Sequence, residues 1–449
     1  MTLLNPLFGW DEVAQVFRDD ARLQKMLDFE AAFARAEGAA GVIPSSAASA
    51  IAGKCRVELF DLSGIGAGAA LAGNLAIPLI TQLKALVDTD DKEAARYVHW
   101  GATSQDAIDT GTVLQLRQAL ELIAGELKRL CDALAQLAMK YRGTVIVGRT
   151  WMQHAVPTTL GVKFASWLDA LARHRTRLRE TTQRCLVLQF GGAVGTLALL
   201  GSQADTVANG LARELKLSVP PAPWHSHRDR MAEIATTMGL LTGTLGKIAR
   251  DISLHMQTEI GEMFEPAGEG RGGSSTMPHK RNPVGCAAIL SAATRVPALV
   301  STMLSAMVQE DERGMGGWHA EWETLPEIVC LTGGAVHKLA QIVPEMEMDS
   351  ERMRENLGLS KGMIFAEGLT AALGEKIGRV QARKQIEAAC QRAGVGKQEL
   401  RSVIEKNTEL SKHLSSAELD QLFDARNYSG SANQFIDQVI EGYKSGDKH

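Results

Sequence analysis

Two long intervals of the sequence contain no proline. The first runs from Pro78 to Pro157 and the second from Pro157 to Pro220, and both are rich in Ala, Leu, Gln, Glu, Lys and Arg. Proline is unfavourable inside a helix because it lacks a backbone N–H and its ring clashes with the preceding turn, whereas those six residue types favour helices. The two intervals therefore predict long helices.

The spacing of apolar residues supports the same prediction. From Leu114 to Ala138 they recur with helical periodicity and give a broad apolar surface, so this helix is expected to pack against neighbours on more than one side. Runs that alternate with a period of two residues, as in a half-buried strand, are almost absent. We therefore predict an all-α protein built around a central bundle of long helices. Further helical stretches are expected over about residues 23–40, 158–184, 228–263, 283–309 and 321–343.

The length of the chain, 449 residues, allows two or three domains. A loop closes the N-terminal part just before Thr103, and shorter helices with polar loops follow Pro344. We expect an N-terminal helical domain over residues 1–101, the central long-helix bundle over 102–345 and a C-terminal helical domain over 346–449.

The composition argues against several classes of function. The 48 basic and 52 acidic residues give a formal charge of -4 and are spread along the chain, so no basic block suits a nucleic acid. The six cysteines lie far apart without a Cys-x-x-Cys pair, which fits neither a zinc site nor a disulfide framework and favours a reducing cytoplasm. Neither a signal peptide nor a membrane-spanning helix is predicted. His225 and His227 have no carboxylate at ligand spacing in the sequence, so no metal is expected.

Three segments carry residues suited to chemistry. The first begins the long central helix, where Thr103 is followed three residues later by Asp106. That spacing is typical of a helix-capping box, which is the more frequent meaning of such a pattern. Thr103 and Ser104 also place hydroxyls and free backbone N–H groups at a helix N-terminus, which suits a substrate carboxylate. Both interpretations stay open at this point.

The second segment runs from Gly148 to Pro157 and contains Thr150, Trp151 and His154. Trp151 and His154 are three residues apart and share a face if the turn between them is helical. The pair then lines a binding site, or it is a buried tryptophan beside a hydrogen-bonded histidine. The spacing alone favours neither.

The third segment covers residues 273–283 and reads GSSTMPHKRNP. Its two serines offer a hydroxyl for proton transfer beside Lys280, Arg281 and Asn282. Cations and dipoles of this kind stabilise the aci form of a carboxylate, whose negative charge grows in the transition state, and a serine can move the proton. A surface turn with a charged exit is the alternative, but Pro278 and Pro283 stiffen the segment at a defined spacing.

These three segments, in this order and spacing, resemble the three shared regions of the fumarase/aspartase superfamily, and the similarity covers nearly the whole chain. The superfamily includes fumarase, aspartase, argininosuccinate lyase and adenylosuccinate lyase. The resemblance implies a homotetramer around a core of long helices, with each active site assembled from three segments on three different subunits. It also implies elimination from, or addition to, the carbon next to a carboxylate of a small substrate, without a metal or an organic cofactor.

Two positions depart from the pattern of the amine-eliminating members. The second segment of those enzymes usually reads Gly-Arg-Thr-His, whereas this chain has Trp151, and Asn74 stands where adenylosuccinate lyases usually carry an N-terminal histidine. An amine leaves only when it is protonated, so loss of both histidines disfavours amine elimination. A carboxylate, with a pKa of ~4, is already ionised at neutral pH and needs no acid to leave and no base to attack.

The departures therefore favour the cycloisomerases of the superfamily, which close a lactone by adding a carboxylate of a carboxylated muconate across a conjugated double bond. Four other stretches also resemble these cycloisomerases, at residues 73–78, 188–192, 223–225 and 318–326.

The resemblance implies roles for single residues. Ser274, or less favourably Ser275, mediates proton delivery, with Lys280 or an ordered water as the alternative donor. Because the expected substrate is a tricarboxylate, a further cation is needed, and Arg313 is the next choice, while His154 is expected to hydrogen-bond a carboxylate. The predicted site residues are Thr103, Ser104, Thr150, Trp151, His154, Ser274, Ser275, Lys280, Asn282 and Arg313.

Three other interpretations remain. An adenylosuccinate lyase-type elimination is weakened by Trp151 and by the lack of an N-terminal Arg-Tyr pair suited to a phosphate. A cycloisomerase for a related muconate, such as a sulfonated one, would carry the same motifs. A non-catalytic structural tetramer, like the lens crystallins related to argininosuccinate lyase, predicts lost loop residues, whereas Ser274, Lys280 and Asn282 are all present.

Overall fold

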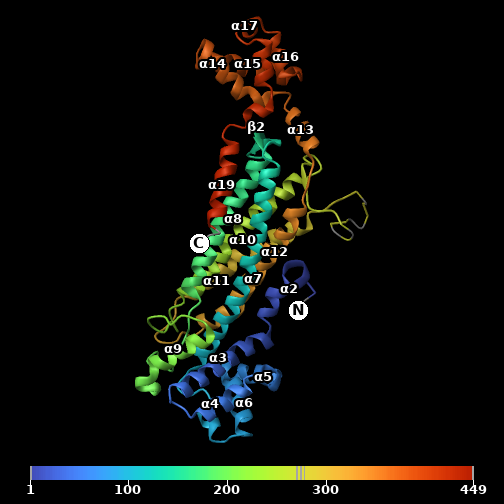
Figure 1. Cartoon of the computed structure of the whole chain (residues 1–449). Helices are drawn as coiled ribbons and strands as arrows, with labels where there is room; N and C mark the ends of the chain where they lie inside the picture. Colours follow the sequence, from blue (N-terminus) through green and yellow to red (C-terminus); the bar gives the residue numbers. More distant parts are fainter. Residues whose placement is uncertain (1–2, 269, 271, 274–275, 278, 447–449) are drawn as a thin grey trace. The chain divides into compact units, whose positions relative to one another are not determined.

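The computed structural model describes residues 3–268, 270, 272–273, 276–277 and 279–446, and its fold is all-α, as predicted. The longest helices match the expected stretches. Helix α10 ends at His255, earlier than predicted, because the chain then turns, with Gly261 in the left-handed region at a φ of 61°. The long helices, labelled in Figure 1, are α7 (Ser104–Lys140), α8 (Leu160–Cys185), α10 (Asp229–His255), α11 (Val284–Ser305) and α12 (Gly317–Ile342).

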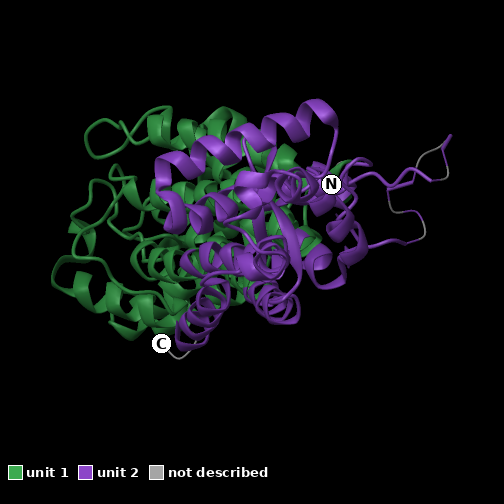
Figure 2. Cartoon of the chain, turned by 90° about the horizontal axis from the view of Figure 1, so that it is seen from above, with its two compact units in different colours: residues 1–127, 174–246, 288–338 green, residues 128–173, 247–287, 339–449 purple. Residues whose placement is uncertain are grey.

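The chain divides into two compact units (Figure 2). Unit 1 comprises residues 1–127, 174–246 and 288–338, and unit 2 comprises residues 128–173, 247–287 and 339–449. Each of the long helices contributes residues to both units. The expected domain limits near residues 101 and 345 stay a prediction.

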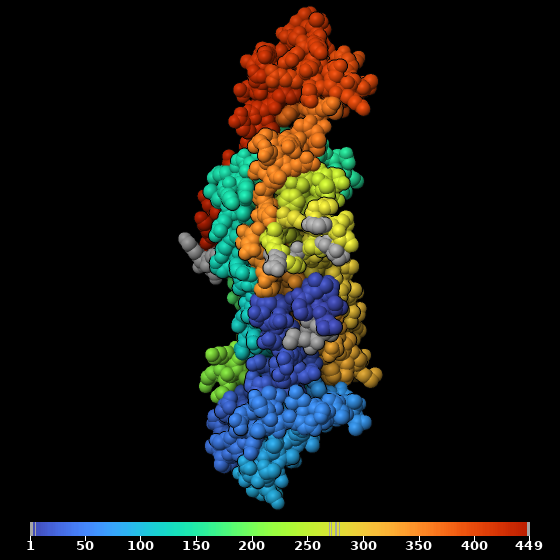
Figure 3. Space-filling view, turned by 90° about the vertical axis from the view of Figure 1, so that its right-hand side faces the viewer, coloured from blue at the N-terminus to red at the C-terminus, as the bar shows by residue number. Residues whose placement is uncertain are grey.

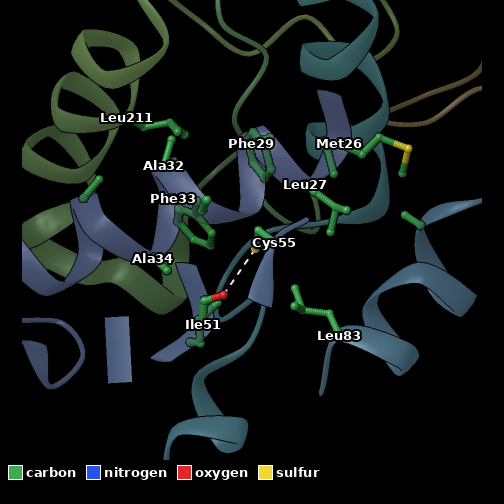
Figure 4. Packing of buried hydrophobic residues seen from close by; sticks show 14 of the residues in the cluster. Met26, Leu27, Phe29, Ala32, Phe33, Ala34, Ile51, Cys55, Leu83 and Leu211 are labelled. Carbon is green, nitrogen blue, oxygen red and sulfur yellow. Dashed lines mark hydrogen bonds between the residues drawn. The ribbon is translucent and has the colours of Figure 1, made fainter. Parts of the chain in front are cut away.

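Unit 1 has its core around α3 (Asp19–Ala39), which confirms the helix predicted over about residues 23–40. Its Phe29 and Phe33 stack at a centroid distance of 5.7 Å within the buried cluster that Figure 4 shows. Phe190 packs edge-on against Phe33 at 5.2 Å, so the loop after α8 is part of this core. The other short helices of unit 1 are α1 (Asn5–Phe8), α2 (Asp11–Val16), α4 (Ser45–Lys54), η1 (Val57–Leu59), α5 (Leu62–Ala72), α6 (Ala76–Asp88), η2 (Ala94–Tyr97), η3 (Ala198–Gln203) and α9 (Ala204–Leu215).

Unit 2 contains the C-terminal helices, and α14 to α18 surround a buried cluster of their own that includes Leu369, Ile386 and Leu400. Figure 3 shows this segment, in orange to red, as a compact body. The helices of this part are η4 (Val343–Glu345), α13 (Ser350–Gly358), η5 (Met363–Phe365), α14 (Ala366–Ile377), α15 (Arg379–Gly396), α16 (Leu400–Glu405), α17 (Thr408–Ser411), α18 (Ser416–Leu422), η6 (Ala425–Tyr428) and α19 (Ala432–Gly446).

Short strands were not expected from the sequence. Strands β1 (Val145–Thr150) and β2 (Gln153–Thr159) form an antiparallel hairpin in unit 2. The β-branched run at the start of β1, Val145-Ile146-Val147, favours extended backbone and accounts for the strand. A smaller antiparallel pair joins β3 (Met263–Phe264) to β4 (Glu347–Met348).

Helix α11 is long and apolar enough to cross a membrane by length and composition, with 28% of its most apolar window buried within the chain. Core helices of soluble proteins pass the same test, so this one helix is weak evidence for a membrane. Pro297 lies within it.

Candidate active site

The first predicted segment lies at the start of α7, in unit 1. The helix begins at Ser104, and the backbone N–H of Thr103 donates to Oδ2 of Asp106 at 3.0 Å. This is the acidic half of a capping box, so the capping interpretation of the spacing is confirmed. Thr103 and Ser104 remain partly exposed at the helix N-terminus, where an anion is favoured by the helix dipole.

Asp106 also binds two other parts of unit 1. Its Oδ1 accepts hydrogen bonds from the backbone N–H of Gly191 at 3.0 Å and from Nε2 of His225 at 2.8 Å. Its Oδ2 accepts a further one from the N–H of Gly192 at 2.9 Å. Two of the stretches that resemble the cycloisomerases, residues 188–192 and 223–225, therefore meet at the first segment. His225 is thus a hydrogen-bonding residue.

The two glycines fit where larger residues would not. A Cβ atom on Gly191 would lie 2.7 Å from Cβ of Pro223, and one on Gly192 would lie 2.8 Å from the carbonyl oxygen of Gly101. Gly192 also has a φ of 68°, which L side chains rarely adopt. The backbone of the 189–192 loop therefore lies directly against the chain that leads into Thr103.

That leading chain is anchored by a buried pair which the sequence did not reveal. Nδ1 of His99 lies 2.7 Å from Oε1 of Glu30, and His99 has a φ of 59°. Burial, the largest single effect, lowers the pKa of His99, but the charge and hydrogen bond of Glu30, with a contribution from Asp106, raise it above its ordinary value. The charged imidazolium favoured by this pair holds the loop before α7.

One turn further along α7, Asp109 binds the buried Arg228. The Nη1 and Nη2 atoms of Arg228 donate to Asp109 at 2.7 and 3.2 Å, and Glu321 binds the other edge of the same guanidinium. Nε1 of Trp318 donates to Asp109 at 3.0 Å. The 318–326 stretch is thereby fastened to the same helix as the first segment.

Arg313, predicted as a further cation for the substrate, lies in unit 1 beside the first segment. Its Nη2 donates to the carbonyl of Ala193 at 2.8 Å, and its Nη1 lies 3.4 Å from Oε1 of Gln105, the residue after Ser104. The guanidinium is thus held next to the start of α7, with part of its hydrogen-bonding capacity already used.

The second predicted segment forms the tip of the β1–β2 hairpin, in unit 2. Arg149 pairs with His154 and Thr150 with Gln153, so Trp151 and Met152 are the two central turn residues. Their φ angles of 52° and 63° are typical of a type I′ turn. The condition for a shared helical face is therefore not met, because Arg149 and Thr150 pair with His154 and Gln153 across a hairpin instead.

The side chains of the hairpin tip face solvent in the single chain. Trp151 is 98% and Met152 70% exposed, so the alternative of a buried tryptophan is also wrong for the subunit. Thr150 and His154 are exposed beside them. Partial burial lowers the pKa of His154, and the charge of Arg149 lowers it further, while the charge of Glu262 has the opposite effect. The net lowering of the pKa favours a neutral imidazole.

Glu262 anchors this hairpin through Arg149 of β1. Its carboxylate accepts hydrogen bonds from Arg149, from Nδ1 of His255 at 2.7 Å and from Nδ2 of Asn356 at 2.8 Å, and it is fully buried. Glu262 immediately precedes β3, from which the chain continues into the third segment. The carboxylate of Glu262 therefore ties the second segment to the chain just before β3, upstream of the third segment.

Hydrogen bonds hold the C-terminal end of the third segment, where the chain enters α11. The carboxylate of Glu265 accepts the backbone N–H groups of Gly285 and Cys286 at 3.1 and 2.7 Å, which caps α11. Arg281 donates to the carbonyl of Glu265 at 2.7 Å and to the carboxylate of Glu347. Of the two neighbouring cations, Arg281 is therefore engaged in holding the loop, whereas the side chain of Lys280 is exposed.

The structure places the predicted residues in two groups. Thr103, Ser104 and Arg313 gather in unit 1. In unit 2, Thr150, Trp151 and His154 share the hairpin, and Lys280 and the partly exposed Asn282 share the loop. Ser274 and Ser275 lie outside the described residues. Within the described part of the chain, no group of three or more His, Cys, Asp or Glu side chains could hold a metal ion.

Comparisons with known proteins identify the family. Residues 9–298 match the lyase family, and residues 362–439 match the adenylosuccinate lyase C-terminus. The chain is 54% identical over 425 residues to a 3-carboxy-cis,cis-muconate cycloisomerase of Pseudomonas aeruginosa, covering 95% of this chain and 93% of that protein. It is 52% identical to the Pseudomonas putida protein of the same name, covering 93% and 99%.

A solved structure shows the same fold. The crystal structure of a 3-carboxy-cis,cis-muconate lactonizing enzyme from Pseudomonas putida matches with a TM-score of 0.95 at 50% identity, and the match covers 99% of both chains. A fumarate lyase from Mesorhizobium sp. BNC1 matches with a TM-score of 0.90 at 39% identity, covering 97% of this chain and 98% of that one. The chain therefore belongs to the lyase family of the fumarase/aspartase superfamily.

Proposed function

We infer that this chain is a cycloisomerase that converts 3-carboxy-cis,cis-muconate to 4-carboxymuconolactone. The reaction is a step of the protocatechuate branch of the β-ketoadipate pathway for aromatic degradation. Relatives at 49–54% identity over nearly the whole chain carry this activity in their names. The observation in the molecule that carries the inference is Trp151 at the exposed tip of the hairpin, where amine-eliminating relatives place a histidine.

The chemistry fits a site without a leaving-group acid. One substrate carboxylate attacks a carbon of the conjugated double bond, a C–O bond forms, and the electron pair of the double bond moves onto the carbon next to another carboxylate. That carbon then takes a proton, so the product is an isomer of the substrate. The attacking carboxylate, with a pKa of ~4, is already charged and needs no base. The developing aci-carboxylate is the charge that the protein must stabilise.

We assign the stabilising groups to residues of the three segments. Lys280 and Asn282, with Thr103 and Ser104 at the positive end of α7, hold the acceptor carboxylate. Ser274 mediates proton delivery, with Ser275 beside it; both lie outside the described residues. The remaining carboxylates of the substrate are bound by Arg313, Thr150 and His154, and Trp151 covers the substrate. A neutral His154 donates a hydrogen bond to a carboxylate without adding a charge.

We further propose a homotetramer whose active sites each combine the three segments of three subunits. The exposed Trp151 needs a partner surface, because a fully exposed tryptophan has nothing in its own subunit to pack against. Leu240, Val284 and Leu304 on α10 and α11 are exposed as well, which suits a helical face covered by another copy. Light scattering that found a stable, fully active monomer would contradict this assembly.

We place the enzyme in the cytoplasm. All six cysteines, Cys55, Cys131, Cys185, Cys286, Cys330 and Cys390, are free thiols in the structure, as expected in a reducing compartment. Fractionation of the producing cells followed by the activity assay tests the assignment.

A substrate panel on the purified enzyme tests the proposed function. Ultraviolet absorbance follows loss of the conjugated diene of 3-carboxy-cis,cis-muconate, of a sulfonated muconate and of the parent muconate, and a parallel assay follows adenylosuccinate cleavage. Rapid turnover of the carboxymuconate is expected. Cleavage of adenylosuccinate without lactonisation would contradict the function, and a preference for the sulfonated substrate would reassign it within the cycloisomerases.

A further inference from the structure

We propose that Asp106 is the positioning residue of the first segment. Its carboxylate fixes the start of α7 and the backbone of Gly191 and Gly192 in the arrangement in which Thr103 and Ser104 meet a substrate carboxylate. The proposal rests on the function inferred above and on the role given there to Thr103 and Ser104. Asp106 itself does not touch the substrate.

The hydrogen bonds of Asp106 use its two oxygens evenly. Within the described residues, Oδ1 accepts from Gly191 at 3.0 Å and His225 at 2.8 Å, and Oδ2 accepts from Gly192 at 2.9 Å and Thr103 at 3.0 Å. The side chain is 0% exposed, so water does not compete for these positions. An ionised carboxylate accepts on both oxygens, whereas an amide presents an NH₂ group to one side. The NH₂ group of an asparagine at this position would therefore face at least one of these N–H donors instead of accepting from it.

The positions tied together come from distant parts of the sequence but are tightly packed. The donor pair at Gly191 and Gly192 follows α8, and the Nε2 donor of His225 precedes α10. A Cβ on Gly192 would lie 2.8 Å from the carbonyl oxygen of Gly101, two residues before Thr103. A shift of the 191–192 backbone is therefore transmitted directly to the chain that presents Thr103.

A positioning role for Asp106 and a purely electrostatic role predict opposite changes in KM when the carboxylate is removed. A carboxylate at the start of α7 lies near a site for a substrate with three negative charges, so its charge alone opposes binding. If charge were its main effect, replacing Asp106 by the neutral Asn would lower KM. If positioning is its main effect, the same change raises KM, because the N–H groups and hydroxyls at Thr103 and Ser104 lose their alignment.

The test uses the full-length enzyme and the carboxymuconate assay. We expect Asp106→Asn to raise KM by roughly tenfold or more, as loss of a charge-assisted hydrogen bond would, while kcat falls by a smaller factor. Glu418→Gln is the matched control, because Glu418 accepts the backbone N–H of Ser415 in the capping box of α18. That variant removes the same kind of helix cap and is expected to keep the KM of the wild type.

An unchanged or lowered KM in Asp106→Asn would overturn the proposal. Circular dichroism and light scattering establish that the variant is folded and assembled. If it is not, Gly192→Ala carries the test, because it leaves the carboxylate in place but pushes the 191–192 backbone from Gly101. A raised KM with a smaller change in kcat supports the proposal, and a wild-type KM refutes it.

The proposed function and the proposed role of Asp106 are tested by different measurements. Turnover of the carboxymuconate by the wild-type enzyme decides the proposed function. The ratio of variant to wild-type KM, measured with whichever substrate of the panel the wild type converts, decides the role of Asp106.

Discussion

The guanidinium of Arg149 and the carboxylate of Glu262 form a bidentate ion pair, with N–O distances of 2.8 and 2.7 Å. Burial, the largest single effect, raises the pKa of Glu262, but the hydrogen bonds from His255, Arg149 and Asn356 together bring it to about 2. The carboxylate is therefore charged at every pH at which the enzyme is expected to work. It holds the strand that leads into Trp151.

This ion pair gives a stability prediction with a defined pH dependence. Because the pKa of Glu262 in the folded state, about 2, lies below the ordinary 4.5, its stabilisation is present above pH 4.5 and is lost as the pH falls towards 2. Glu262→Gln leaves Arg149 unpaired in a largely buried position and should cost about 3–5 kcal/mol at pH 7. Unfolding midpoints at pH 7 and pH 3 measure the effect. A loss as large at pH 3 as at pH 7 would contradict the assignment.

For Glu37 on α3 we expect a contribution to stability with the opposite pH dependence. Burial, followed by the nearby charge of Glu30, raises its pKa from 4.5 to about 9. The folded state therefore favours the protonated carboxyl, and this stabilisation is complete below pH 4.5 and is lost as the pH rises through 9. Glu37→Gln, which is neutral at every pH, should flatten the decline of the melting temperature between pH 5 and 9. The exposed Glu12→Gln is the control and should leave the decline as it is in the wild type.

Replacement of Lys280 should lower the activity with little change in stability. Its side chain is exposed, so Lys280→Ala is expected to change the free energy of unfolding by no more than about 0.5 kcal/mol. Loss of a cation that stabilises the aci-carboxylate should lower kcat by roughly 100-fold or more. The ultraviolet assay and thermal unfolding measure the two effects, with the exposed Lys406→Ala as control. Near-normal lactonisation by Lys280→Ala would show that the site is wrongly assigned.

Trp151→His should not create an amine-eliminating enzyme. The second position of that chemistry, Asn74, is held just before α6, where its Oδ1 accepts the N–H groups of Ala76 and Ile77 at 3.0 and 3.2 Å. We expect no adenylosuccinate cleavage by the variant. Loss of the aromatic contact costs about 0.5–1.5 kcal/mol, so kcat/KM for lactonisation should fall by roughly two- to tenfold. Appreciable cleavage of adenylosuccinate would disprove the argument from leaving-group acids.

The helices could be predicted because their signals are local. The proline-free intervals and the periodic apolar residues of α7 specify a helix within a single stretch of sequence. The hairpin was missed because its turn consists of Trp151 and Met152 rather than the Asn-Gly or Asp-Gly pair that usually marks a type I′ turn. Both residues have positive φ angles, which is unfavourable for L side chains and cannot be read from residue types.

The sequence names candidate residues for the site but not the residues that hold them in place. Motif resemblance pointed to residues such as Thr103 and Lys280, each named from its own segment. The contacts of Asp106 reach residues 85 to 119 positions away, and those of Glu262 reach Arg149 across 113 positions. Pairings at such separations leave no local pattern. The one available signal was the double glycine at Gly191 and Gly192, which marks a close backbone approach.

Asp106 and Glu262 are sealed from solvent, whereas Lys280 is exposed. At physiological ionic strength the field of an exposed charge fades within about 8 Å, while a buried ion pair is screened far less. Added salt should therefore raise KM for the trianion well before it loosens the backbone that these carboxylates hold. We therefore expect attraction of the substrate to depend on the ionic strength of the medium and the backbone geometry of the site to be independent of it.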